Sequence, residues 1–127
     1  MAETIRNRPK FLDLREIKLP LPGLASILHR ISGAGLFLLL PFLIWLFELS
    51  LSSPDSYQTL QAIAAHPLVK LFSIGLLWAF LHHFCMGLRI LLIDIHVGVE
   101  KAQARASAKA VFVVSLALTV ILGGMLW

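Results

Sequence analysis

The chain has 127 residues, of which 58% are apolar and only 14% are charged, and its mean hydropathy is +0.85. These values exclude a soluble domain of this size, whose surface would need far more polar side chains, and they predict an all-α integral membrane protein. The formal net charge of +4 does not require a nucleic-acid partner, because Lys and Arg gather on the cytoplasmic side of membrane spans.

The first part of the chain divides into a polar segment and a long apolar run. Residues 1–22 are polar and basic, and we expect a cytoplasmic N-terminal segment that lies on the membrane surface or against a soluble partner. Residues 23–127 are expected to form a three-helix transmembrane anchor domain. Its first span is predicted over residues 23–49, which exceeds the roughly 20 residues that a crossing helix needs. Pro41 should bend this span.

Two further apolar runs follow after polar connections. The connection over residues 50–67 contains turn and cap residues such as Ser53, and its residues 57–65 suit a short interfacial helix. The second span is predicted over residues 68–95 and the third over residues 110–127. Both are long enough to cross the apolar part of a bilayer.

The basic residues predict how the chain is oriented. Three spans place the two termini on opposite sides of the membrane. With the N-terminus inside, ten of the eleven Lys and Arg residues fall on the inner side and only Lys70 falls outside. Because positive charge stays in the cytoplasm, we predict a multi-pass protein of a bacterial inner membrane, with a cytoplasmic N-terminus and a periplasmic C-terminus.

The first polar cluster along the chain lies early in the first span. Ser26 and Arg30 are four residues apart and Gly33 follows seven residues after Ser26, so all three share one helical stripe. A hydroxyl and a guanidinium can donate hydrogen bonds to a quinone carbonyl, and a cation stabilises the negative charge that develops during reduction. We therefore predict a quinone site at Ser26 and Arg30. The spacing equally allows Arg30 to reach lipid headgroups while His29 sits in the interface.

A second cluster interrupts the apolar run of the second span. Ionisable groups there are costly unless they face a cavity, a partner or a cofactor. Residues i and i+4 share a helix face, so Gly87 should leave room beside His83 for a flat cofactor. We hypothesise that His83 is an axial ligand of haem b. A structural histidine bonded to a neighbouring helix is the alternative. Arg89 and Asp94 are expected to be boundary charges or an ion pair.

The depths of the two clusters are compatible. At about 1.5 Å per residue, His83 lies roughly 18 Å from the cytoplasmic end of its span, and Arg30 lies roughly 12 Å from the start of its own. Haem propionates extending from His83 would reach the level of His29 and Arg30, whose positive charge would offset two carboxylates in an apolar setting. No second histidine on another span is deep enough to be the other axial ligand. The second ligand should therefore come from another polypeptide in a hetero-oligomer.

The combined motifs resemble those of the larger cytochrome b membrane anchor of bacterial succinate dehydrogenase, respiratory complex II. The resemblance covers essentially the whole chain and rests mainly on the Ser-x-x-His-Arg-x-Ser-Gly block at residues 26–33 and on the His-x-x-x-Gly-x-Arg block that begins at residue 83. It implies a four-subunit enzyme. A flavoprotein subunit oxidises succinate, an iron–sulfur subunit carries the electrons, and two membrane anchors hold haem b and reduce ubiquinone.

The resemblance also implies roles for individual residues. His83 matches the haem ligand, with the second ligand supplied by the smaller anchor. Ser26 and Arg30 match the ubiquinone site, and His29 and Arg30 match groups near the haem propionates. No catalytic residue and no succinate site are expected in this chain. Family members often have a histidine directly after the motif arginine, and Ile90 stands there instead, so any propionate contact from that position is absent or replaced.

Two other interpretations stay open from the sequence. The anchor of a fumarate reductase, which works in reverse with menaquinone, is the nearest one. A haem-free structural anchor or a small transporter subunit belongs to a different class. Against a transporter, the sequence contains no pair of broken helices and no inverted repeat.

Overall fold

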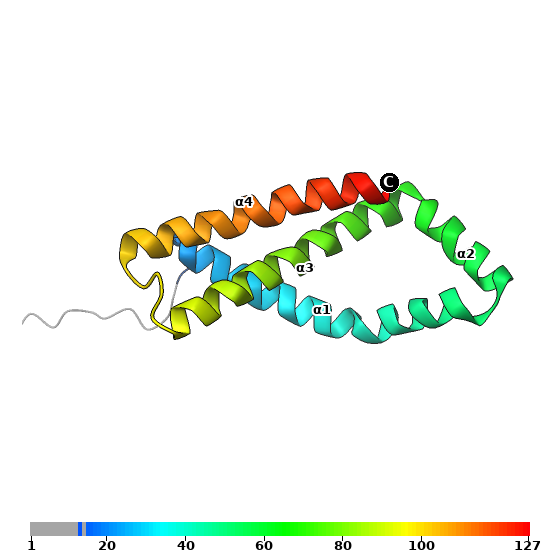
Figure 1. Cartoon of the computed structure of the whole chain (residues 1–127), viewed down its shortest axis with the longest axis horizontal. Helices are drawn as coiled ribbons and strands as arrows, with labels where there is room; N and C mark the ends of the chain where they lie inside the picture. Colours follow the sequence, from blue (N-terminus) through cyan, green and yellow to red (C-terminus); the bar gives the residue numbers. More distant parts are fainter. Residues whose placement is uncertain (1–12, 14) are drawn as a thin grey trace, which may run out of the picture.

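A computed structural model describes residue 13 and residues 15–127, which form helices without any strand. The helices are α1 (Leu21–Ser52), α2 (Pro54–Ala65), α3 (Pro67–Asp94) and α4 (Lys101–Leu126). Helices α1, α3 and α4 are long and apolar enough to cross a membrane, which confirms the all-α fold with three spans (Figure 1). Most of the expected N-terminal segment lies outside the described residues. The orientation in the membrane stays a prediction.

The helices begin earlier than the expected spans do. Helix α1 starts at Leu21, after the extended Pro20, and Pro22 lies in its first turn, where a proline costs no helical hydrogen bond. Helix α4 starts at Lys101 rather than at residue 110. Its first turns are rich in Ala, Lys, Arg and Gln, which are strong helix formers even where they are too polar for lipid. The third helix therefore extends beyond its apolar part.

The interfacial helix is α2, and it begins at Pro54 rather than at residue 57. A capping box starts it: the Ser56 N–H donates to Ser53 Oγ at 3.1 Å, and the Ser53 N–H donates to Ser56 Oγ at 3.0 Å. This tight junction lets the chain turn sharply at the end of α1. Helix α2 then connects the diverging ends of α1 and α3 (Figure 1).

Helix α3 packs against both α1 and α4, and small side chains allow the close approach. The buried core consists of Ala25, Met86, Ala108 and Val111. Ser115 and Thr119 of α4 are also buried, and their hydroxyls donate to carbonyls of their own helix. Most large apolar side chains are exposed, as expected for a helix bundle that faces lipid or other membrane helices.

Arg89 joins α3 to the start of α4. Its side chain is buried, Nε donates to Ser107 Oγ at 2.9 Å, and Nη2 donates to the Ala104 carbonyl at 3.1 Å. Asp94 is exposed and takes no part in this arrangement. The expected ion pair between Arg89 and Asp94 is therefore wrong, because Arg89 turns toward α4, where a hydroxyl and a carbonyl satisfy it.

Replacing Arg89 with Met should destabilise the docking of α4, because the substitution keeps the length of the side chain and removes its hydrogen bonds to α4. We expect a loss of about 2 kcal/mol, the usual contribution of hydrogen bonds to a charged group. The measurement is the thermal denaturation midpoint of the detergent-solubilised protein. Arg105→Met, at an exposed arginine of α4, is the control. Equal shifts in the two variants would contradict this role of Arg89.

Candidate functional site

The two polar clusters meet where α1 and α3 cross. The rings of His29 and His83 stack with their centroids 4.2 Å apart and their planes 7° from parallel. The sequence placed His29 at the level that propionates extending from His83 would reach. The structure brings the two rings into direct contact instead, so the clusters form one site.

The backbone of α1 determines how the His83 ring is held. Its Nδ1 lies 3.1 Å from the His29 carbonyl oxygen and 3.4 Å from Ser32 Oγ. Because a carbonyl only accepts, Nδ1 donates in the shorter of these contacts, and in the neutral tautomer with this proton Nε2 carries the free lone pair. A histidine whose Nδ1–H is bonded to a backbone carbonyl is the usual arrangement of a metal ligand that binds through Nε2.

A glycine of α1, Gly33, makes room for the His83 ring. A Cβ at Gly33 would lie 2.8 Å from His83 Cε1 and 3.2 Å from its Nδ1. A Cβ at Gly87 would instead lie 3.9 Å from His29 Nε2. Gly87 therefore faces His29 in this structure, and the room that it is expected to leave for a flat cofactor beside His83 stays a prediction. Gly33 follows His29 by four residues and so shares its helix face, and this spacing could have indicated from the sequence that Gly33 belongs to the site.

His82 is directed away from this site. It is only 1% exposed, and its ring packs against Trp78 and Phe112 inside the bundle. Its Nε2 lies 3.3 Å from the Ala25 carbonyl oxygen. Of the two adjacent histidines, only His83 is half-buried at the α1–α3 crossing. The structure thus separates their roles.

Ser26 and Arg30 lie one turn apart on α1, near its N-terminal end. Ser26 is half-buried and Arg30 is exposed. A cation and a hydroxyl therefore lie on one stripe of α1, in the same part of the helix as His29.

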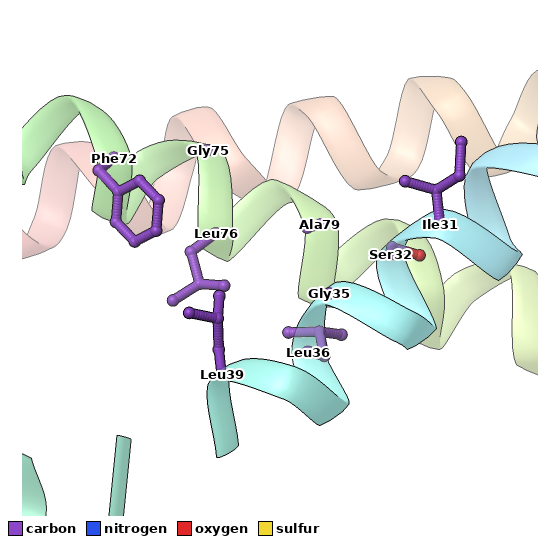
Figure 2. A pocket seen from close by; sticks show the side chains of 9 residues that line it. All are labelled: Ile31, Ser32, Gly35, Leu36, Leu39, Phe72, Gly75, Leu76 and Ala79. Atoms are coloured by element: carbon purple, nitrogen blue, oxygen red, sulfur yellow. The ribbon is translucent and has the colours of Figure 1, made fainter. Parts of the chain in front are cut away.

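An apolar groove of about 340 Å³ begins beside the histidines and runs between α1 and α3 (Figure 2). Ser32, which also contacts His83, lies at one end of it (Figure 2). A Cβ at Gly35 or Gly75 would meet nothing within 4 Å, so the groove has free space along both helices. Its lining residues are Ile31, Ser32, Gly35, Leu36, Leu39, Phe72, Gly75, Leu76 and Ala79.

The side chains around His83 do not form a metal cage of their own. Among the described residues there is no cluster of three or more His, Cys, Asp or Glu side chains suited to a metal ion. The His29 and His83 rings cannot hold a metal between them either. Ring nitrogen lone pairs lie in the plane of the ring, whereas these rings face each other. The described residues alone would therefore supply at most one imidazole nitrogen to a metal at this site.

Comparison with known proteins gives consistent matches. Residues 4–122 match the family described as the succinate dehydrogenase/fumarate reductase transmembrane subunit. A succinate dehydrogenase cytochrome b556 subunit from Coxiella burnetii is 36% identical over 122 residues, covering 95% of this chain and 98% of that protein. The subunit of the same name from Paracoccus denitrificans is 31% identical over 122 residues, covering 95% and 94%. The one from Rickettsia felis is 29% identical over 120 residues, covering 94% of each.

Proposed function

This chain belongs to the succinate dehydrogenase/fumarate reductase transmembrane subunit family, and on that basis we propose that it is the haem b-binding anchor of a succinate dehydrogenase. In that role it contributes to ubiquinone reduction and holds the flavoprotein and iron–sulfur subunits at the bacterial inner membrane. The relatives named above are succinate dehydrogenase subunits, which favours succinate oxidation over fumarate reduction. Their name, cytochrome b556, favours haem over a haem-free anchor.

The observation that carries the proposal is the hydrogen bond from His83 Nδ1 to the His29 carbonyl. It orients the ring and leaves Nε2 free for the iron of a haem, whose porphyrin supplies four further ligands. Gly33 provides the clearance that this ring position needs. When bound, haem b supplies a centre that accepts and returns one electron. Because the stacked His29 and His83 rings cannot both bind one iron, a second protein ligand would come from the smaller anchor subunit.

Positive and polar groups beside His83 suit the carboxylates of a haem. His29 stacks on the proposed ligand, and Arg30, the next residue of α1, has a long exposed side chain that we propose reaches the propionates. Ile90, where related proteins often have a histidine, packs against the buried core that includes Met86. It offers no polar group, and we assign the propionates to His29 and Arg30.

Ser26 and Arg30 supply the polar contacts of the proposed quinone site. The Ser26 hydroxyl donates to a carbonyl oxygen of ubiquinone and fixes the headgroup. The Arg30 guanidinium offsets the negative charge that develops on the ring oxygens, which lowers the barrier to reduction. Exposure of Arg30 on the outside of α1 gives a lipid-soluble quinone access from the membrane. With the predicted orientation, this site lies in the cytoplasmic half of the bilayer.

Replacing His83 with Ala should remove haem from the assembled complex, because His82 lies inside the bundle and cannot take over as ligand. The reduced-minus-oxidised spectrum of the purified complex measures the b-type haem per enzyme. His96→Asn is the control, since His96 is an exposed loop histidine with a φ of 63°, a conformation that asparagine tolerates. Unchanged haem content in the His83 variant would rule His83 out.

Replacing Gly33 with Ala should lower haem content without removing the ligand. The new methyl group would press on Cε1 of His83 and turn the ring away from the His29 carbonyl. We expect haem occupancy to fall severalfold. Gly35→Ala, two residues further along α1, adds the same methyl group in open space and should retain haem. Equal haem loss in both variants would point to helix propensity or assembly instead.

Replacing Ser26 or Arg30 with Ala should impair quinone reduction selectively. For Ser26→Ala we expect about a tenfold loss in kcat/KM for ubiquinone, which corresponds to about 1.4 kcal/mol for one hydrogen bond. Succinate oxidation with an artificial acceptor should persist, because that reaction bypasses the anchor. Ser50→Ala is the control at the other end of α1, where the hydroxyl bonds to its own helix. A parallel fall in both activities would indicate faulty assembly.

A further inference from the structure

Ala25 is the only fully buried residue of α1, and His82 of α3 binds its backbone. The Ala25 carbonyl can only accept, so His82 donates from Nε2 across the 3.3 Å that separate them. Both residues are essentially excluded from solvent, with exposed fractions of 0% and 1%. This hydrogen bond therefore ties the N-terminal part of α1 to the centre of the bundle.

If packing were its only role, a histidine at residue 82 would be less favourable for stability than an apolar side chain. Its Nδ1 is buried and has no hydrogen-bond partner among the described residues, and the same is true of Nε1 of the neighbouring Trp78. Burying an unpaired polar atom costs free energy that an apolar side chain of similar size would not incur. The hydrogen bond that His82 makes to the Ala25 carbonyl offsets part of this cost.

The position of Ala25 links this bond to the quinone site. Ser26 is the next residue, and Arg30 lies one turn beyond Ser26 on the same helix. Helix α1 begins at Leu21, so Ala25 lies just beyond the first turn, close to the N-terminal end of the helix. A hydrogen bond to α3 at Ala25 therefore holds α1 directly beside Ser26.

We propose that His82 is a positioning residue of the quinone site, which holds the α1 backbone at Ala25 so that Ser26 can donate to the quinone. This inference rests on the proposed function, because it takes Ser26 as the quinone donor. It assigns the two adjacent histidines to different tasks. His83 faces the α1–α3 crossing, while His82 holds α1 in place from within the bundle.

The test compares His82→Gln with His82→Met in the assembled membrane complex. Gln retains one donor and one acceptor on a side chain of suitable reach, whereas Met has similar length and no hydrogen bond to offer. For His82→Met we expect the KM for ubiquinone to rise about five- to tenfold, the effect of one misplaced hydrogen bond. Haem content and succinate oxidation with an artificial acceptor should stay at wild-type levels, and His82→Gln should restore the KM.

A double-mutant cycle asks whether His82 acts through Ser26. If it does, adding His82→Met to the Ser26→Ala variant should leave the KM for ubiquinone unchanged, because the hydroxyl being positioned is already gone. Additive effects would overturn the proposal, and so would equal behaviour of the Gln and Met variants or an unchanged KM in His82→Met.

Failure of assembly is also decisive. His82→Asn stays polar, but its shorter amide cannot reach the Ala25 carbonyl, so it should raise the KM as Met does. Loss of haem and of artificial-acceptor activity in both the Met and Asn variants would show that His82 is needed for folding rather than for positioning. A wild-type complex without haem or quinone reduction would instead refute the proposed function, which keeps the two failures distinguishable.

Discussion

The hydrogen bond between His83 and the His29 carbonyl is the contact on which the rest of the site depends. Inside a membrane, a polar side chain must be satisfied by protein, by a cofactor or by trapped water. His83 has two ring nitrogens, and α1 satisfies only one of them. The crossing of two helices thereby creates an oriented imidazole with one free lone pair. The same crossing explains the parallel His29 ring and the need for glycine at residue 33.

Much of this arrangement could be predicted from the sequence, because bilayer thickness and apolar runs specify the spans. His83, His29, Ser26 and Arg30 were found as ionisable or polar groups in such runs. The contacts between helices could not be predicted, since a single sequence does not specify which face of α1 meets α3. The side chain that Gly87 faces and the α4 partners of Arg89 were therefore not predicted. The start of α4 was predicted too late because residues 101–109 favour a helix but are too polar to belong to an apolar span.

Two adjacent histidines can serve different purposes because neighbouring residues on a helix point about 100° apart. His83 is half-buried at the crossing of α1 and α3, and His82 is directed into the bundle, where its Nε2 bonds to a backbone carbonyl. Sequence spacing favoured His83 because Gly87 follows it by four residues, and that argument about cofactor space stays a prediction. The choice now rests on burial, which separates a solvent-excluded ring from a half-buried one.

The bundle buries too little of α1 to be a self-sufficient unit. Along its full length only Ala25 is fully buried, and large side chains such as Phe37 and Leu38 are about three-quarters exposed, at 75% and 76%. Lipid can cover such surfaces, but lipid cannot supply an axial ligand. The His83 imidazole near the end of the apolar groove supplies, on the proposed function, one of the two protein ligands that the haem site needs. On the proposed function, haem joins this chain to its neighbour through a ligand from each, so that binding the cofactor and assembling the two anchors stabilise each other.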